Sequence, residues 1–475
     1  MTAPLWTLDA LATAMAGRVV GPAGAAATGI SIDSRTIAPG EAFFAIKGDL
    51  HDGHDFVAKA LERGAAFAVV AEARLADLPA DGRYVVVDDV LAGLVRLGIA
   101  ARGRTTARIV AVTGSVGKTS TKEALAMVLR EHGRVHASVA SFNNHWGVPL
   151  TLARMPADTE FGVFEIGMNH AGEITPLTGM VRPHVAVVTT VAPVHLEFFA
   201  SVEKIAEAKA EIFSGLEPGG HAVVNGDIPT APILIETARR CGAAVHRFGE
   251  GEGLESRLIA VDLRPGDSTL TASILGRTVT AEIGAPGRHI AMNALAILTA
   301  AVLLGADLDR AAAALVRLAP PKGRGARFTL ALPDGAATLI DESYNANPAS
   351  MRAAIALLGQ SRPGPGGRRI AVLGDMRELG PTGAELHAAL AGPLAEAGID
   401  RAYLCGPLMH ALWQALPDTL HGAYAETSAG LEPNLPGEIR SGDVVMVKGS
   451  LGSRMIPIVD ALKARFAAQT EPERA

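Results

Sequence analysis

The segment that most constrains this chain is Val110-Ala-Val-Thr-Gly-Ser-Val-Gly-Lys-Thr-Ser-Thr121. Apolar residues from Ile109 to Val112 predict a buried strand, the glycines Gly114 and Gly117 interrupt the pattern, and a helical stretch begins at Lys118. A strand, a glycine loop and a helix in this order form a cradle for phosphate. Glycines let backbone N–H groups come close to an anion, and the helix N-terminus adds unpaired donors.

The side chains of this loop predict how a phosphate is held. Lys118 can reach the β- and γ-phosphates of a nucleotide, and the Thr119 hydroxyl can ligate Mg²⁺. The pattern is a shortened variant, because Val112 stands where the usual loop has a further glycine. The alternative interpretation is a simple tight turn before a helix. We predict phosphate contacts from the loop residues Thr113, Gly114, Ser115, Val116, Gly117, Lys118, Thr119 and Ser120.

Length and composition favour a multidomain globular protein. The 475 residues predict about three domains, and 49% hydrophobic with only 19% charged residues predicts large buried cores. A net charge of −6 argues against a nucleic-acid partner. Two cysteines, Cys241 and Cys405, indicate a reducing compartment. The N-terminus has no basic leader and the longest apolar run, 290–306, is short for a bilayer, so we expect a cytoplasmic protein without a membrane span.

Strands and helices alternate along the chain, which predicts an α/β fold with parallel sheets covered by helices on both faces. The predicted domains are 1–103, 104–319 and 320–475. The central one is a P-loop-type parallel-sheet domain, flanked by an N-terminal α/β domain and a C-terminal Rossmann-like domain. In the last domain we expect strands and helices at Ala337–Ile340, Ala349–Leu358, Ile370–Leu373, Gly383–Ala397, Ala402–Cys405, Val444–Val447 and Ser453–Phe466.

Polar side chains gather between apolar strands of the first domain, in the segments 30–48 and 52–56. They either hold a charged ligand or cap turns, and the residues alone leave both interpretations open. The candidates for a ligand are Ser31, Asp33, Ser34, Arg35, Lys47, Asp52 and His54.

Two apolar strands of the central domain carry further candidates at their ends. Glu165 closes the strand 161–167, and His195 follows the strand 185–191. Ligands of open α/β sheets bind beyond the carboxyl ends of the strands, so both side chains are expected to face the phosphate loop. A carboxylate there can ligate Mg²⁺. His195 is a less usual Mg²⁺ ligand, and it can instead cap an element or lie in the core.

A lysine lies on the apolar face of the helix predicted over 201–213. Helical spacing places Lys209 beside Val202, Ile205 and Ile212. One interpretation is that its stem is buried and its ammonium reaches solvent. The other is that it points toward the phosphate loop. It would then balance phosphate charge or, after carbamylation, present two oxygens to a second metal, because an ammonium itself has no acceptor.

The last domain contributes Asp341-Glu-Ser-Tyr-Asn-Ala-Asn-Pro348 after a strand. Asp341 at a strand end suits a ribose hydroxyl, although a turn built from Asp, Asn and Pro explains the segment equally well. The segments 374–380 and 448–454 end two more strands, and all three can form one pocket.

Seven motifs in order resemble the Mur ligase family over nearly the whole length. They are Asn143-Asn-His-Trp-Gly-Val-Pro-Leu150, Glu165-Ile-Gly-Met-Asn-His-Ala-Gly172, Ala208-Lys-Ala-Glu-Ile-Phe213, Gly287-Arg-His-Ile-Ala-Met-Asn-Ala294, Asp341 to Pro348, Gly374-Asp-Met376 and Val447-Lys-Gly-Ser450. Within the family, the chain is similar to the member that joins D-alanyl-D-alanine to UDP-N-acetylmuramoyl-tripeptide. The Tyr-Ala-His-Thr-Pro and Asp-Asn-Pro-x-Arg segments typical of the preceding ligase do not occur here.

The resemblance implies a monomer whose three domains bind the UDP substrate, ATP and the incoming dipeptide. Thr119 and Glu165 would hold the magnesium of ATP, and His195 with carbamylated Lys209 a second Mg²⁺; Lys118, His195 and Lys209 would be catalytic. The resemblance further implies ATP contacts from Asn293, Arg324, Asp341, Tyr344 and Asn345. Substrate contacts would come from the first-domain candidates and from Asn143, Asn144, Asp375, Lys448 and Ser450.

Two departures from the family pattern affect which residues of this chain can be assigned family roles. Ile290 stands where the family often has Asn, and Gly323-Arg-Gly-Ala-Arg327 leaves open whether Arg324 or Arg327 is the nucleotide arginine. Two rival functions remain. One is another amide ligase of the family, such as folylpolyglutamate synthase. The other is a P-loop switch or motor ATPase that forms no amide.

Overall fold

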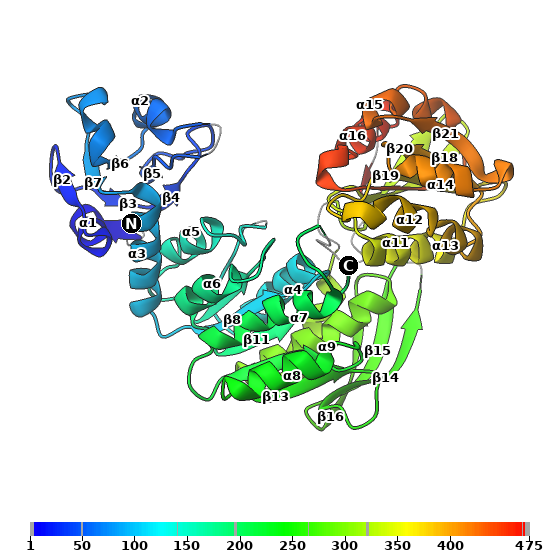
Figure 1. Cartoon of the computed structure of the whole chain (residues 1–475), viewed down its shortest axis with the longest axis horizontal. Coiled ribbons are helices and arrows are strands. Elements are labelled where there is room, and N and C mark those ends of the chain that lie inside the picture. The colour runs from blue at the N-terminus through cyan, green and yellow to red at the C-terminus, as the bar shows by residue number, and fades with distance from the viewer. Residues whose placement is uncertain are drawn as a thin grey trace.

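The computed structural model describes residues 4–48, 51–139, 141–193, 197–264, 266–319, 323–467 and 469–470. It contains three larger sheets of five, nine and seven strands, formed by successive parts of the chain (Figure 1). The predicted α/β architecture with three domains is therefore confirmed. The predicted boundaries fall between the sheets, near residues 103 and 319. No helix of the described residues is long and apolar enough to cross a membrane.

The first domain has a five-stranded sheet of order β2-β7-β6-β5-β4. Only β2 runs antiparallel to its neighbour. A short two-stranded pair, β1 and β3, lies beside it. The elements are β1 Trp6–Thr7, α1 Leu8–Met15, β2 Arg18–Val20, β3 Ala26–Ala27, β4 Gly29–Ser31, β5 Glu41–Phe44, α2 Val57–Glu62, β6 Phe67–Ala71, β7 Tyr84–Val87 and α3 Val90–Gly103.

Helix α3 joins the first domain to the central one. It packs against α5 (Gly147–Ala153), so closely that a Cβ on Gly98 would lie 3.1 Å from the carbonyl oxygen of Pro149. Trp6 Nε1 donates to the carbonyl oxygen of Ala153 at 2.8 Å, and the Arg104 guanidinium lies 3.5 Å above the Trp6 ring. Side chains of α5 belong to the apolar core of the first domain. These contacts hold the two domains together.

The central sheet has the order β16-β15-β14-β13-β12-β11-β8-β10-β9, so the strand before the phosphate loop is surrounded by others. Helices α4, α9 and α10 cover one face, and α5 to α8 cover the other. The elements are β8 Arg108–Thr113, α4 Lys118–Arg130, β9 Val135–Ala137, β10 Phe161–Glu165, α6 Ile174–Val181, β11 Val185–Val188, α7 Val202–Ala210, β12 His221–Asn225, α8 Ala231–Arg240, β13 Ala244–Gly249, α9 Arg288–Leu303 and α10 Leu308–Ala314.

Three strands extend this sheet in a way that the prediction of a parallel sheet missed: β14 Ser256–Leu263, β15 Ser268–Ile274 and β16 Arg277–Ile283. They pair antiparallel with one another. The residues of β15 and β16 alternate between buried and more exposed positions, which is typical of strands with one covered face. The turn Leu275-Gly276, with φ of +48° and +86°, joins β15 and β16 as a tight hairpin.

The last domain has a seven-stranded sheet of order β21-β20-β19-β22-β18-β17-β23, in which β17 pairs antiparallel with both of its neighbours, β18 and β23. Strands and helices occur at most of the predicted places. They are β17 Ala326–Leu332, β18 Gly335–Glu342, α11 Pro348–Gln360, β19 Arg369–Gly374, α12 Gly383–Ala388, α13 Ala391–Glu396, β20 Arg401–Cys405, α14 Met409–Ala415, β21 His421–Ala425, α15 Ser428–Leu431, β22 Val444–Lys448, α16 Ile456–Arg465 and β23 Gln469–Thr470.

One helix prediction in this domain was wrong. The single helix expected over 383–397 is two short helices, α12 and α13, separated at Ala389 and Leu390. Pro393 supplies a physical reason: it has no N–H, and its ring collides with a helical carbonyl four residues earlier, at Ala389.

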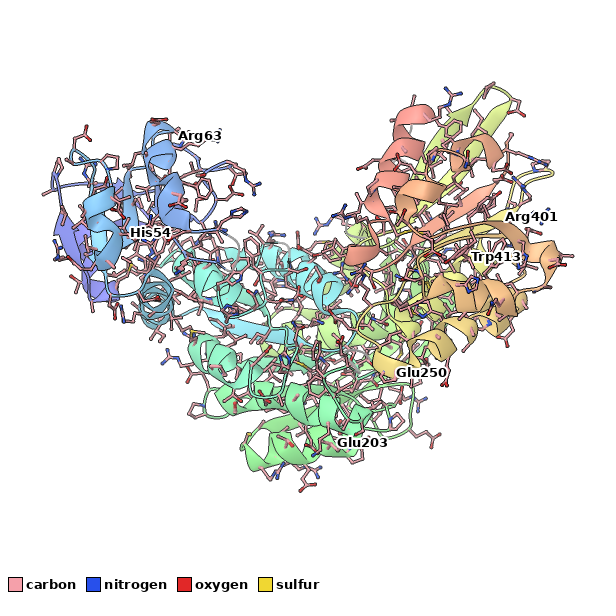
Figure 2. All side chains as sticks on the ribbon, turned by 45° about the horizontal axis from the view of Figure 1, so that its top comes forward. His54, Arg63, Glu203, Glu250, Arg401 and Trp413 are labelled. Atoms are coloured by element: carbon pink, nitrogen blue, oxygen red, sulfur yellow. The ribbon has the colours of Figure 1, made fainter. Side chains whose placement is uncertain are left out.

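The first and last domains lie at opposite ends of the central domain (Figure 1). His54 and Arg63 mark the first domain and Arg401 and Trp413 the last, on opposite sides of the view in Figure 2. Described contacts between the central and last domains include the Tyr344 hydroxyl, 3.2 Å from Ser141 Oγ, and the Glu197 N–H, 3.4 Å from the carbonyl oxygen of Glu378.

Candidate active site

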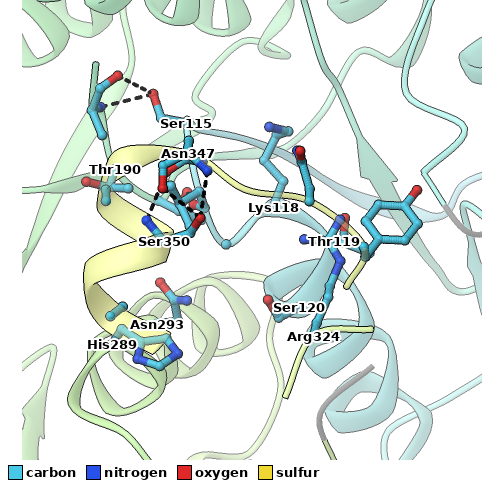
Figure 3. Close-up of a pocket in the computed structure, with 18 of the residues that line it drawn as sticks. Ser115, Lys118, Thr119, Ser120, Thr190, His289, Asn293, Arg324, Asn347 and Ser350 are labelled. Atoms are coloured by element: carbon cyan, nitrogen blue, oxygen red, sulfur yellow. Dashed lines mark hydrogen bonds between the residues drawn. The ribbon is translucent and has the colours of Figure 1, made fainter. Parts of the chain in front are cut away.

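A cavity of about 520 Å³ lies between the central and last domains. Its walls are the phosphate loop, the ends of β10 and β11, the first turns of α9 and α11, and the ends of β18 and β22. Figure 3 shows labelled side chains from four of these parts around the same space. Of the predicted nucleotide residues, those lining the cavity are Ser115, Val116, Gly117, Lys118, Thr119, Ser120, Asn293, Arg324, Tyr344 and Asn345.

The phosphate loop is held by the strand beside it. A Cβ on Gly114 would lie 2.0 Å from Thr189 Oγ1, so only glycine fits there. Thr189 Oγ1 donates to the carbonyl oxygen of Val116 at 2.6 Å. Ser115 Oγ donates to the carbonyl oxygen of Ala192 and accepts from its N–H, at 3.1 and 3.0 Å (Figure 3). Thr113 and Gly114 therefore support the loop rather than line the cavity.

Two lysines, Lys118 and Lys209, lie in this region, and burial acts on both. Lys118 Nζ donates to the carbonyl oxygen of Gly114 at 2.7 Å, and burial lowers its pKa while Glu165 opposes the shift. Lys209 is only 2% exposed and does not line the cavity. Burial lowers the pKa of Lys209 well below its ordinary value, and the nearby charge of Lys118 lowers it further. The interpretation that its ammonium reaches solvent is therefore wrong.

The arrangement around Glu165 fits a cation. Glu165 is 1% exposed; its Oε1 accepts from Asn143 Nδ2 at 2.7 Å, and its buried Oε2 has no hydrogen-bond partner among the described residues. An unpaired buried carboxylate oxygen is costly unless a ligand compensates it, and oxygen is the ligand atom Mg²⁺ prefers. Thr119 lines the same cavity, with its Oγ1 3.4 Å from Ser141 Oγ.

Protein carboxylates alone would not enclose that cation. Within the described ranges, no group of three or more His, Cys, Asp or Glu side chains is placed to hold a metal ion. The remaining ligands would have to be phosphate oxygens or water, as is usual for Mg²⁺ bound with a nucleotide. His195, the predicted ligand of a second metal, lies outside the described residues.

The structure distinguishes the two arginines that the sequence left open. Arg324 lines the cavity, and its guanidinium lies 4.4 Å above the ring of Tyr344. Arg327 does not line the cavity; its Nη2 donates to Ser361 Oγ at 3.1 Å. The geometry therefore favours Arg324 as the nucleotide arginine.

At the end of β18, the carboxylate that lines the cavity is Glu342, not the predicted Asp341. Asp341 is 2% exposed, accepts from Ser343 Oγ at 2.6 Å and lies 3.6 Å from Lys463 Nζ. Successive residues of a strand point to opposite faces, so only one of the two carboxylates can face the cavity. Glu342 Oε2 accepts from Lys448 Nζ at 3.1 Å. Strand periodicity indicates only that one of the two carboxylates faces the cavity; the place of β18 in its sheet decides that it is Glu342.

The cavity also contains residues on two helices that are absent from the sequence-based prediction. They come from the motifs that begin α9 and α11, and they are His289, Met292, Asn347 and Ser350. Asn347 and Ser350 form a capping box at the start of α11 (Figure 3). In the sequence, these residues lie beside Gly287 and Pro348, which mark the starts of two helices. Only the packing of the last domain on the central one brings the two helix starts together.

Of the predicted substrate residues, Asn143 and Lys448 line the cavity, whereas Asn144, Asp375 and Ser450 do not. Asn144 Oδ1 accepts from the Gly147 N–H at 3.0 Å and so caps α5. Asp375 Oδ1 accepts from the Met409 N–H at 2.9 Å, and burial raises the pKa of this carboxyl. Ser450 Oγ accepts from the Arg377 N–H at 2.9 Å. All three hold the backbone of adjoining segments.

The first-domain candidates lie apart from this cavity. His54 is buried; its Nε2 accepts from the Ala71 N–H at 2.9 Å, and its Nδ1 lies 2.6 Å from Asp52, which also pairs with Arg74. Neither nitrogen of His54 remains for a ligand, so its predicted contact with substrate does not fit the structure.

The other first-domain candidates form the turn after β4. Asp33 accepts from Arg35 Nη2 at 2.8 Å and from the backbone N–H of Arg35, while the Arg35 side chain is 80% exposed. The hydrogen bonds to Arg35 lower the pKa of Asp33. Ser31 Oγ accepts from the Asp33 N–H at 3.2 Å. Ser34 is buried and Lys47 is exposed. Arg35 and Lys47 therefore carry the exposed positive charges of this set.

Comparison with known proteins gives the same assignment for all three domains. Three family models match: the Mur ligase family catalytic domain over 26–95, the Mur ligase middle domain over 112–301 and the Mur ligase glutamate ligase domain over 326–451. A protein of Bacillus subtilis named UDP-N-acetylmuramoyl-tripeptide–D-alanyl-D-alanine ligase is 34% identical, over 91% of this chain and 93% of its own length.

Solved structures agree. The crystal structure of MurF from Acinetobacter baumannii matches with a TM-score of 0.83 and 30% identity, over 96% of this chain and 99% of that one. MurF from Thermotoga maritima in complex with ADP matches with a TM-score of 0.76 and 26% identity, over 92% and 98% of the two chains. With three matched domains and relatives alike over nine-tenths of its length, this chain belongs to the Mur ligase family.

Proposed function

We propose that this protein joins D-alanyl-D-alanine to UDP-N-acetylmuramoyl-tripeptide, coupled to cleavage of ATP to ADP and phosphate. The product is UDP-N-acetylmuramoyl-pentapeptide, a precursor of peptidoglycan in cell wall biogenesis. The main structural support is one cavity between two domains. The phosphate loop and the Glu165 carboxylate, whose Oε2 has no hydrogen-bond partner among the described residues, line its central-domain side. Relatives named UDP-N-acetylmuramoyl-tripeptide–D-alanyl-D-alanine ligase, which match nine-tenths of the chain, support the choice of substrates. We place the enzyme, as a monomer, in the cytoplasm.

ATP is needed because a carboxylate does not react with an amine at neutral pH: its leaving group would be oxide. Transfer of the γ-phosphoryl group to the tripeptide carboxylate makes an acyl phosphate. The dipeptide amine then attacks the carbonyl carbon, and the tetrahedral intermediate expels phosphate. Lys118, aligned with the phosphate loop, would neutralise charge that spreads over the transferred phosphoryl oxygens.

The chain offers ligands for the metal ions that such a transfer requires. Thr119 and Glu165 would hold the Mg²⁺ of ATP, and His195 with carbamylated Lys209 a second one. When bound, Mg²⁺ supplies charge neutralisation at the phosphates. Asn143 would keep Glu165 oriented, because its amide already donates to one carboxylate oxygen at 2.7 Å.

The exposed Arg35 and the turn around it would bind the UDP part of one substrate in the first domain. The last domain would bind the dipeptide near Lys448. Because the first and last domains stand at opposite ends of the central domain (Figure 1), joining their substrates calls for domain closure.

The test is one coupling assay with ATP, Mg²⁺, UDP-N-acetylmuramoyl-tripeptide and D-alanyl-D-alanine, followed by mass spectrometry. We expect the pentapeptide product and one ADP per amide. L-alanyl-L-alanine and a folate with glutamate serve as controls. ADP without an amide would instead support the switch or motor ATPase. Product from folate but not from the muramoyl nucleotide would support the other ligase of the family.

A fragment of residues 1–318 should fold but bind ATP weakly. Its apolar cores do not include side chains of the last domain, whereas the cavity takes Arg324, Tyr344 and Asn345 from beyond the cut. Circular dichroism should show a cooperative unfolding transition, and calorimetry should show weakened ATP binding. An affinity equal to that of the full chain would contradict a nucleotide site shared between domains.

Glu342 should matter more for nucleotide binding than Asp341. Glu342→Gln keeps an oxygen for Lys448 but removes the charged acceptor in the cavity, and the Kd for ADP should rise about tenfold, the size of one hydrogen bond to a charged group. Asp341→Asn is the matched control, because it sits on the other face of the strand. Calorimetry of ADP binding to both variants tests this prediction. A larger loss of ADP affinity in Asp341→Asn would restore the sequence-based assignment.

A further inference from the structure

One carboxylate outside the cavity, that of Glu211, accepts four hydrogen bonds from a single segment. Its Oε1 accepts from the Gly172 N–H at 2.6 Å. Its Oε2 accepts from the N–H groups of Ile174 and Thr175, at 3.2 and 3.1 Å, and from Thr175 Oγ1 at 3.1 Å. These donors form the N-terminus of α6, which the side chain of its own N-cap residue, Glu173, does not cap.

The segment that Glu211 holds is part of the cavity wall. It begins where β10 ends at Glu165, and its residues Gly167, Met168 and Asn169 line the cavity. The Gly167 N–H donates to the carbonyl oxygen of Asn143 at 2.8 Å, which fixes one end of the segment. The hydrogen bonds to Glu211, starting at Gly172, fix the other end.

Glu211 itself belongs to the element that carries Lys209. It begins the 3₁₀ helix η3 (Glu211–Gly215), which continues α7 directly after Ala210. This element and α6 touch closely: Thr178 Oγ1 donates to the carbonyl oxygen of Ile212 at 2.8 Å, and a Cβ on Gly215 would lie 2.3 Å from the carbonyl oxygen of Thr178. The end of α7 and the helix α6 are therefore packed tightly against each other.

We propose that Glu211 is a positioning residue for ligation: its carboxylate sets where the buried Lys209 lies relative to the wall 167–169 and to Glu165. This inference rests on the proposed function. A negative charge at a helix N-terminus is favourable by itself. The position of the two segments that Glu211 joins goes beyond a helix cap. Glu211 lies two residues after Lys209 on the same element, and the segment that it holds continues the chain from Glu165.

The other carboxylates of this helix offer a contrast. Glu207, one turn earlier, is exposed and pairs only with the exposed Lys204 at 2.7 Å among the described contacts. Because supporting groups of a metal or phosphate site typically contribute about 10- to 100-fold to activity, loss of the Glu211 carboxylate should cost about that much in kcat. The KM for ATP should stay within about threefold, because the phosphate loop is held separately, by Thr189 and Ala192.

The experiment compares Glu211→Ala, Glu211→Gln and Thr175→Ala in the full chain with Glu207→Ala as the matched control. Steady-state kinetics, thermal unfolding and hydrogen exchange of segment 167–175 are measured for each. We expect Glu211→Ala to lose kcat about 10- to 100-fold at a temperature where it is fully folded, with faster exchange across 167–175. Glu211→Gln, which keeps an acceptor oxygen, should recover part of the loss, and Glu207→Ala should behave like the parent.

Two results would overturn the inference. One is a lower Tm with kcat within about twofold of the parent, which is what a purely structural cap predicts. The other is a rise in the KM for ATP as large as the fall in kcat, which indicates general loss of the site. If Glu211→Ala does not fold, Glu211→Gln and Thr175→Ala decide by the same criteria. If the parent enzyme forms no amide, the proposed function fails, while hydrogen exchange still tests whether Glu211 holds the wall.

Discussion

Lys118→Ala is expected to lower kcat of the ligation by about 10²-fold or more, as removal of other preorganised electrostatic groups does. Lys118 lines the cavity, and its Nζ already lies 2.7 Å from the carbonyl oxygen of Gly114 within the phosphate loop. Phosphoryl transfer spreads negative charge over the oxygens that this ammonium would contact. The measurement is single-turnover formation of the pentapeptide at saturating ATP.

The variant must be shown to be folded, because Lys118 is partly buried, its pKa is lowered by that burial, and removing its charge changes stability as well as chemistry. Thermal unfolding and ADP calorimetry serve as controls. Lys118→Arg, which keeps a positive charge but not the compact ammonium, should recover only part of the rate. Near-normal turnover of folded Lys118→Ala would exclude the assigned role.

Lys209→Ala is expected to lose most activity, and acetate is expected to restore part of it. Lys209 is 2% exposed, so its side chain has almost no contact with water. An unmodified ammonium here would repel Mg²⁺, by several kcal/mol at ~4 Å even with an effective dielectric near 20. A carbamate would replace this repulsion with two oxygen ligands, and acetate would fill the same place in the alanine variant.

The lowered pKa of Lys209 acts in the direction that carbamate formation needs. Carbamate forms reversibly from the neutral amine and CO₂, and burial followed by the charge of Lys118 favours the neutral amine. The rescue should be absent in Lys204→Ala, because Lys204 lies on the exposed side of the same helix and pairs with Glu207. Parent-like turnover of Lys209→Ala would contradict the hypothesis, as would a bare ammonium in density of the ATP-bound enzyme.

Local patterns of the sequence were sufficient for the phosphate loop. The phosphate loop, the strand before it and the helix beginning at Lys118 all occur where the residues predict them. This works because the positive φ values of the two loop glycines, +149° and +86°, are a conformation that glycine adopts readily and other residues rarely do. The placement of Lys209 on a buried face was likewise readable from helical periodicity, since the apolar stripe of a helix is a property of its own sequence.

Tertiary structure alone decided which of several equally plausible polar residues reach the cavity. Asp341 and Glu342 are adjacent and both acidic, and the register of β18 in its sheet determines that Glu342 faces inward. Likewise, Arg324 lies over the Tyr344 ring at the cavity, whereas Arg327 donates to Ser361 Oγ. In the sequence, Glu211 is one charged residue among several in its segment. Only the fold places the start of α6, with its four donors, against the Glu211 carboxylate. Sequence periodicity says which face a side chain is on, but only long-range packing says what that face meets, because the partners are supplied by other elements.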